Sequence, residues 1–246
     1  MNTVKLGHIA ILCFALVSVS CTRRSNNYSS GVVAQRPTVE QNSISTPPIR
    51  HEVNASQVSQ GSKLSASEVF DKYNTAVFMV YTSNGWNEFQ GSGFFINSSG
   101  LAVSNYHVFK GTGVGLETIK LANGTKCKLK SVVAKSSEYD FILFYVDIPG
   151  TCNYIPVSNR QSKVGEKVFT IGSPRGLENT FSSGEISQLR GNNIIQINAP
   201  IDHGSSGGVL INEYGEAIGI TSSGYDDSGA NLNFALDIKA VKPYVK

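Results

Sequence analysis

Two serines stand side by side in the glycine-rich segment 201–212, IDHGSSGGVLIN. A serine hydroxyl is a weak nucleophile unless a general base takes its proton and a third group orients that base. The chemistry of this segment therefore depends on which histidine could serve one of these serines, and on which carboxylate could hold that histidine.

The chain offers four histidines, namely His8, His51, His107 and His203. His8 lies in the predicted signal peptide and leaves with it, and His51 lies in residues 22–62, whose composition cannot build a core. His203 is only three residues from Ser206 and is constrained by the same turn. We therefore predict that His107, at the end of the run LAVSNYHVF, is the general base, and that His203 is a loop residue.

The chain order of the groups narrows the choice of carboxylate. GSSGG fits the Gly-x-Ser-x-Gly pattern of α/β-hydrolases, but those enzymes need a later histidine and none follows His203. An acid ahead of the histidine, as in subtilisin, would have to be Asp71. The order His, Asp, Ser remains, and Asp140 is its best candidate because it opens the apolar run FILFYV. We interpret Glu138 and Asp147 as solvated surface charges.

The elements that must position these residues are mostly strands. SASEVFDKYNTAV has a candidate N-cap at Ser65 and apolar residues at helical spacing, which predicts a short helix before the strand AVFMVYTS. Strand-like runs and turn signals then recur about every ten residues, giving about a dozen strands. This predicts an all-β barrel or sandwich over residues 63–246, closed by a short helix in DIKAVKPYVK.

The composition is typical of one folded domain preceded by a flexible N-terminal segment. The 246 residues are 40% hydrophobic and only 16% charged, with 24 glycines, which suits a turn-rich β domain. The net charge of +3, without a Lys/Arg cluster, excludes a nucleic-acid-binding surface. Residues 22–62 are rich in Ser, Asn, Gln and Pro, and we predict that they form a disordered linker.

Residues 1–21 are predicted to be a signal peptide. Lys5 precedes the apolar run LGHIAILCFALVSV, which is too short for a comfortable membrane span. Two alternatives remain at its end, SVSC: ordinary cleavage near Ser20, or a bacterial lipoprotein signal with lipid on Cys21, where Ser18 replaces the usual Leu. Both export the chain to the periplasm or cell envelope, and the second anchors it to a membrane.

Two of the four cysteines, Cys127 and Cys152, lie in the predicted domain. An even pair in an oxidising compartment predicts a disulfide between them. The alternative is two buried free thiols, because the separation of the two residues cannot be derived from sequence.

Several blocks resemble, in order, those of trypsin-like serine proteases, most of all the bacterial high-temperature-requirement (HtrA-like) type. They are GSGFFINSSGLAVSNYHV, SEYDFILFYV, IGSPRGLENTFSSGEIS, GSSGGVLIN, GEAIGI and NFAL, and they cover about residues 70–240. The resemblance implies two six-stranded antiparallel β-barrels with short flanking helices. Such proteases usually continue into peptide-binding PDZ domains, but this sequence ends at Lys246, so we expect no PDZ domain.

The family motif Gly-x-Ser-Gly-Gly implies a role for each residue of GSSGG. Ser206 is then the nucleophile, and the backbone N–H groups of Gly204 and Ser206 form the oxyanion hole, which stabilises the negative charge of the tetrahedral intermediate. Ser205 stands where many secreted digestive relatives carry an Asp that pairs with a new N-terminus. The resemblance therefore implies activity without such a cleavage.

The resemblance also implies a neutral substrate pocket. Pro200 stands six residues before the nucleophile, where a preference for Lys or Arg would need an acid. Thr221 stands where glutamyl-specific relatives carry a His. With Ser222 and Ser223, these residues predict a pocket for a small or medium apolar side chain.

The predicted function is thus an exported serine endopeptidase that acts on proteins or peptides through His107, Asp140 and Ser206 and an acyl-enzyme, without a metal or cofactor. The alternative from another class is a protease-fold module without catalysis that binds peptides or partner proteins. Reaction of Ser206 with a fluorophosphonate probe would separate the two.

Overall fold

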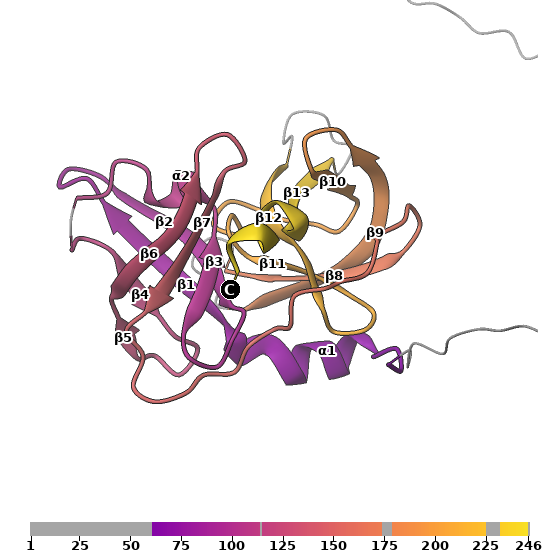
Figure 1. Cartoon of the computed structure of the whole chain (residues 1–246), viewed down its shortest axis with the longest axis horizontal. Helices are drawn as coiled ribbons and strands as arrows, with labels where there is room; N and C mark the ends of the chain where they lie inside the picture. The colour runs from indigo at the N-terminus through magenta and orange to yellow at the C-terminus, as the bar shows by residue number, and fades with distance from the viewer. Residues whose placement is uncertain (1–60, 114, 174–178, 225–231, 246) are drawn as a thin grey trace, which may run out of the picture. The chain divides into compact units, whose positions relative to one another are not determined.

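The computed structural model describes residues 61–113, 115–173, 179–224 and 232–245, with the side chains of 223 and 224 excepted. All of them belong to one compact unit, Ser56–Lys246. The predicted signal peptide, Cys21 and nearly all of the predicted linker lie outside the described residues. Figure 1 shows a sheet built from the earlier part of this unit beside a barrel built from the later part.

Helix α1 (Ala66–Tyr73) opens the described chain, as the sequence predicts. The Ser65 side chain accepts from the Glu68 backbone N–H, and the Glu68 carboxylate accepts from the Ser65 N–H at 2.7 Å. This reciprocal capping box satisfies two N–H groups that the first helical turn leaves without partners. Phe70 of the helix meets the ring of Phe181 edge-on, with centroids 5.8 Å apart, so α1 packs against the barrel.

The first half is an antiparallel sheet of seven strands in the order β5-β4-β1-β2-β3-β7-β6. The strands are β1 (Val77–Ser83), β2 (Glu88–Phe95), β3 (Leu101–Ser104), β4 (Thr118–Lys120), β5 (Lys126–Cys127), β6 (Leu129–Ser136) and β7 (Phe141–Val146). Pairing of β3 with β7 places Ser104 opposite Ile142. The chain that leaves β3 therefore lies beside the chain that enters β7.

The second half is a closed antiparallel barrel of six strands in the order β10-β13-β12-β11-β8-β9. Its strands are β8 (Lys167–Gly172), β9 (Thr180–Arg190), β10 (Ile194–Ile197), β11 (Val209–Asn212), β12 (Ala217–Gly224) and β13 (Asn233–Asp237). Val209 of β11 pairs with Ile220 of β12, so the segment before β11 lies beside the end of β12.

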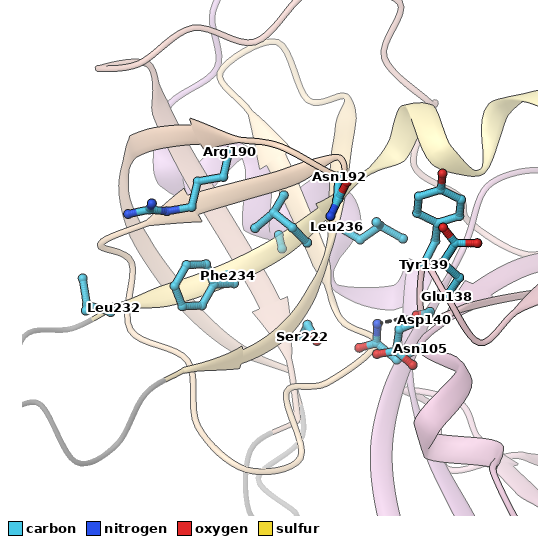
Figure 2. A pocket seen from close by; sticks show the side chains of 12 residues that line it. Asn105, Glu138, Tyr139, Asp140, Arg190, Asn192, Ser222, Leu232, Phe234 and Leu236 are labelled. Atoms are coloured by element: carbon cyan, nitrogen blue, oxygen red, sulfur yellow. Dashed lines mark hydrogen bonds between the residues drawn. The ribbon is translucent and has the colours of Figure 1, made fainter.

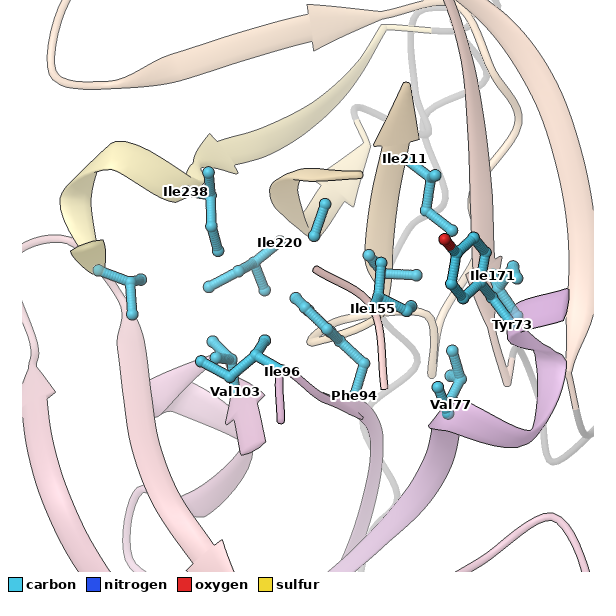
Figure 3. Packing of buried hydrophobic residues seen from close by; sticks show 14 of the residues in the cluster. Tyr73, Val77, Phe94, Ile96, Val103, Ile155, Ile171, Ile211, Ile220 and Ile238 are labelled. Atoms are coloured by element: carbon cyan, nitrogen blue, oxygen red, sulfur yellow. The ribbon is translucent and has the colours of Figure 1, made fainter. Parts of the chain in front are cut away.

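One hydrophobic core joins the two halves. Phe94, Ile96 and Val103 of the first half belong to the same buried cluster as the barrel residues Ile171 and Ile220. Figure 3 shows the barrel isoleucines facing the side chains of the sheet. Because the two halves share their buried apolar surface, the groups that each half carries at the junction are held in a fixed relation.

The all-β fold is confirmed, with two differences from the prediction. The second half is a six-stranded barrel, but the first is a seven-stranded sheet, because the short strand β5 extends the pairing beyond β4. The predicted C-terminal helix is instead two 3₁₀ turns, η4 (Ile238–Ala240) and η5 (Lys242–Tyr244). Pro243 has no N–H to donate, which limits regular helix there.

Cys127 and Cys152 are both free thiols in the structure, so the predicted disulfide between them is not formed. Cys127 lies buried in β5, and Cys152 packs against the same hydrophobic cluster. The Cys152 thiol donates to the carbonyl of Asn97 at 3.4 Å. Burial raises the pKa of both thiols, so both are held in the neutral form. The structure thus has the alternative of two free thiols, of which Cys127 is buried and Cys152 is partly buried.

Candidate active site

His107 lies in the one-turn helix α2 (Tyr106–Phe109), directly after β3. Asp140 directly precedes β7 and has a positive φ of 55°, which is uncommon for a residue with a side chain. The His107 N–H donates to Asp140 Oδ1 at 2.8 Å, and His107 Nδ1 lies 2.7 Å from Asp140 Oδ2. Both carboxylate oxygens thus hold the same histidine, which fixes the direction of its ring.

The backbone of Asp140 is held by the two residues before His107. The Asn105 amide donates to the Asp140 carbonyl at 2.9 Å, and the Tyr106 N–H donates to the same oxygen at 3.2 Å. Asn105 is fully buried. Sequence reasoning missed this residue, although an asparagine two positions before the candidate base, at the end of an apolar strand, was a visible signal.

The two adjacent serines differ in their surroundings. Ser205 is buried, and its hydroxyl accepts from the Asp202 N–H at 3.4 Å. Ser206 is partly exposed, and its hydroxyl donates to the Ser222 carbonyl at 2.6 Å. Within the described residues, no hydrogen bond joins Ser206 to His107. His203 is exposed and lies in the turn before them.

Strand β2 brings the histidine helix and the serine turn together. A Cβ added at Gly91 would lie 2.7 Å from the methyl groups of Val108 and 3.1 Å from the carbonyl oxygen of Ser206. The neighbour of His107 and the backbone of Ser206 therefore approach the same point of β2. Only glycine leaves room for both.

The turn that carries Ser206 leaves two backbone donors unpaired. Gly204 has a φ of +95°, a conformation that glycine adopts without strain. The Ser205 N–H donates to the Asp202 carbonyl at 2.9 Å and the Gly207 N–H to the Thr221 carbonyl at 2.8 Å. Among the described residues, neither the Gly204 nor the Ser206 N–H has an acceptor.

A pocket of about 890 Å³ opens beside Asp140 and Ser222. Figure 2 shows Asp140, Glu138 and Tyr139 at one end and Arg190 and Leu232 at the other, with Phe234 and Leu236 between them. We call this the Asp140–Arg190 groove. Between its two charged ends the groove is lined by the apolar side chains of Ile194, Phe234, Ala235 and Leu236, together with the polar Asn192 and Ser222.

Glu138 is exposed, as the sequence predicts, and it also lines the groove next to Asp140. The Arg190 guanidinium, at the far end, donates to Gln196 Oε1 at 2.8 Å through Nε. A bound peptide would therefore meet opposite charges at the two ends of the groove.

The predicted pocket residues occupy separate positions. Ser222 lines the Asp140–Arg190 groove. Thr221 is buried, and its hydroxyl donates to the Ser205 carbonyl at 2.7 Å, so it stabilises the turn that carries the two serines. Pro200 is exposed, and its carbonyl accepts from the Ser182 hydroxyl at 2.6 Å. The side chain of Ser223 lies outside the described residues. The preference for a small apolar side chain stays a prediction.

The described residues contain no group of three or more His, Cys, Asp or Glu side chains that could hold a metal ion. None of their helices has the length and apolar character needed to cross a membrane.

The chain is similar to a protein-family model and to several known proteases. The family model of the trypsin-like peptidase domain matches residues 91–220, over half of the chain. A probable periplasmic serine endoprotease DegP-like of Rhizobium meliloti (strain 1021) is 34% identical over 160 residues, which cover 61% of this chain and 31% of the relative. Protease Do-like 5, chloroplastic, of Arabidopsis thaliana is 32% identical over 195 residues, covering 69% of this chain and 60% of that protein.

A solved structure agrees with the sequence relatives. The crystal structure of the serine endoprotease from Yersinia pestis matches with a TM-score of 0.66 and 26% identity, over 74% of this chain and 65% of that one. The chain thus spans about a third of the length of the Rhizobium relative and about two thirds of the Yersinia chain.

Proposed function

Because the chain belongs to the trypsin-like peptidase family, we propose that it is an exported serine endopeptidase whose catalytic groups are Ser206, His107 and Asp140. The observation that carries this proposal is the double hold of Asp140 on His107, at 2.7 and 2.8 Å, beside a turn that leaves the Gly204 and Ser206 N–H groups unpaired. In this proposal His107 is the base, Asp140 orients it, and the Gly204 and Ser206 N–H groups are the oxyanion donors.

In the proposed reaction, Ser206 Oγ attacks the carbonyl carbon of the scissile peptide bond, and its proton passes to His107 Nε2. Asp140 accepts from Nδ1, so it keeps the ring in the required tautomer and stabilises the imidazolium. The oxyanion of the tetrahedral intermediate accepts from the Gly204 and Ser206 N–H groups. The C–N bond then breaks as His107 returns the proton to the leaving amine, and water hydrolyses the acyl-enzyme with the same base.

The resting position of Ser206 adds one step to this sequence. Its hydroxyl donates to the Ser222 carbonyl at 2.6 Å, so its side chain must turn toward His107 before attack. Rotation about one side-chain bond takes picoseconds to nanoseconds for partly exposed residues, so this step does not limit turnover.

The proposed substrates are proteins or peptides with apolar side chains near the scissile bond, which Phe234 and Leu236 in the middle of the Asp140–Arg190 groove would contact. The proposed site of action is the periplasm or cell envelope. Names of relatives support this location, since the Rhizobium protein is described as periplasmic. Lipid on Cys21 would anchor the chain there and belongs to the same proposal.

The proposed enzyme is active without cleavage of its N-terminus. Ser205 cannot form an ion pair with a new amino group, and its hydroxyl is already engaged with the Asp202 N–H. Activity of a chain kept uncleaved ahead of Leu64 tests this point. A chain that stays inactive until it is cut would contradict it.

A fluorophosphonate probe tests the proposed function, because it forms a covalent bond only with an activated serine. We expect labelling of the native chain and of Ser205→Ala, and no labelling of Ser206→Ala. Cleavage of an unfolded protein substrate, followed by mass spectrometry, should show the same pattern. A folded native chain that neither labels nor cleaves would favour the non-catalytic binding module.

A further inference from the structure

The motif Gly91-Ser92-Gly93 in the middle of β2 is not part of the proposed triad. Ser92 is fully buried. Its flanking glycines let other segments approach, since a Cβ at Gly91 would meet Val108 and the Ser206 carbonyl. Such close approach places the Ser92 backbone and hydroxyl directly against the turn that carries the nucleophile.

Ser92 makes four hydrogen bonds, two of which tie this turn to the first sheet. Its N–H donates to the Ser206 carbonyl at 2.8 Å, and its hydroxyl donates to the Gly204 carbonyl at 2.8 Å. The hydroxyl also accepts from the Ser173 N–H at 2.9 Å, and the Ser92 carbonyl accepts from the Ser104 hydroxyl at 2.7 Å. One residue of the first half thus holds the carbonyls on both sides of Ser205.

The hydrogen bonds of the turn show what this hold does. The Gly204 and Ser206 carbonyls are taken by Ser92, and the Ser205 carbonyl by the Gly208 N–H and the Thr221 hydroxyl. The Ser205 N–H donates to Asp202. Within the described chain, the groups of residues 204–206 that stay unpaired are the Gly204 and Ser206 N–H groups, which are the proposed oxyanion donors.

We infer that Ser92 is a positioning residue for the oxyanion hole, an inference that rests on the proposed function. Its hydroxyl fixes the peptide between Gly204 and Ser205. Without that hydroxyl, the partly buried Gly204 carbonyl loses its partner in the described chain, and only the bond from the Ser205 N–H to the Asp202 carbonyl still holds this peptide. Glycine dihedrals are free enough for the Gly204 carbonyl to turn toward another donor. The Gly204 N–H and the Gly204 carbonyl are attached to the same Cα. If the carbonyl turns, the direction of the N–H is therefore no longer fixed.

The test compares Ser92→Ala and Ser92→Cys with the native chain. Loss of a whole oxyanion donor costs about 10² to 10³ in kcat, so partial loss of its orientation in Ser92→Ala should lower kcat by about tenfold or more, with KM nearly unchanged. A peptide aldehyde, whose adduct with Ser206 places an oxyanion in the hole, should lose affinity by the same factor. Ser92→Cys keeps a weak S–H donor, so its kcat and its affinity for the aldehyde should lie between those of the native chain and those of Ser92→Ala.

Ser158→Ala is the matched control. Ser158 is buried, donates to Glu216 Oε2 at 2.8 Å and accepts from the Arg160 N–H at 3.1 Å, so its replacement removes a similar pair of hydrogen bonds outside the site. We expect it to lower stability but to leave kcat and aldehyde affinity unchanged. If Ser92→Ala behaves in the same way, Ser92 is a structural residue only and the inference is wrong.

A spectroscopic measurement keeps this result separate from the proposed function. The Gly204 amide resonance should be single and sharp in the native chain and in Ser158→Ala, and broadened or doubled in Ser92→Ala. This can be recorded even in a chain that does not label with fluorophosphonate, in which case the proposed function fails by itself. An unchanged Gly204 resonance in Ser92→Ala overturns the inference. If Ser92→Ala does not fold, Ser92→Cys decides by the same measurements.

Discussion

Replacing Asp140 with asparagine changes one polar atom of the proposed triad and leaves its size unchanged. In the structure, Asp140 Oδ1 accepts the His107 N–H at 2.8 Å and Oδ2 lies 2.7 Å from Nδ1. An asparagine that keeps the first bond through its oxygen presents an NH₂ group to Nδ1, which must then accept. The proton of the neutral ring moves to Nε2, where it prevents that nitrogen from taking the Ser206 proton.

The expected loss is large because the wrong tautomer removes the base altogether. The same change in the corresponding triad of other serine proteases lowers kcat by about 10⁴. At about 1.36 kcal/mol per tenfold, this is about 5.4 kcal/mol of transition-state stabilisation. We expect a fall of this order for Asp140→Asn, with a much smaller change in KM.

The assay is the initial rate of cleavage of a fluorogenic peptide with apolar residues near the scissile bond. Asp147→Asn is the control, since Asp147 is an exposed carboxylate at the far end of β7, and it should leave kcat unchanged. Circular dichroism should show the native fold for both variants. A folded Asp140→Asn chain with kcat within about tenfold of the native value would refute the orienting role of Asp140.

Three further changes test other parts of the structure. Glu138→Gln should lower kcat/KM for a peptide with a Lys in the groove, relative to the same peptide with a Gln there, by up to about fivefold, the effect of an exposed charge pair of about 0.2–1 kcal/mol. An unchanged ratio places the peptide elsewhere. Cys127 and Cys152 should react with an alkylating agent slowly in the native chain, because burial raises the pKa of both thiols. In the unfolded chain both should react without a reductant, and mass spectrometry that finds them unreactive under that condition would reveal a disulfide. Hydrogen bonds from Ser65 hold the pKa of Glu68 below its usual 4.5, so its stabilising effect is present above that value and is lost as the pH falls through the lower folded value. Glu68→Ala should therefore lower the Tm at pH 7 more than in acid, and equal shifts at both would contradict the capping role.

Local features of this protein were predictable because neighbouring residues produce them. Ser65 and Glu68 form a capping box at the required spacing of three residues, and α1 begins where the sequence predicts. Alternating and buried apolar runs gave the strands, since side-chain period and turn residues are properties of short segments. The predicted C-terminal helix was wrong because 3₁₀ and α-helical turns share the same short-range signals.

The candidate site was predictable in part. The scarcity of histidines and the order of the groups pointed to His107 and Asp140, and the structure joins the two by two hydrogen bonds. Asn105 and Ser92 were missed because their partners lie 35 and 112 residues away. No local pattern distinguishes a buried serine that holds a distant carbonyl from one that only fills a strand.

By itself, the sequence determined which elements form and which residue types are available for chemistry, because both depend on composition and short-range spacing. Tertiary structure alone decided that Cys127 and Cys152 stay as thiols, that Glu138 lines a groove and that Ser206 rests on the Ser222 carbonyl. Each of these depends on tertiary packing, within the first half for the two cysteines, within the second half for Ser206, and between the two halves for the groove. Such packing brings together residues far apart in the chain, and their separation in space is not encoded in any single segment.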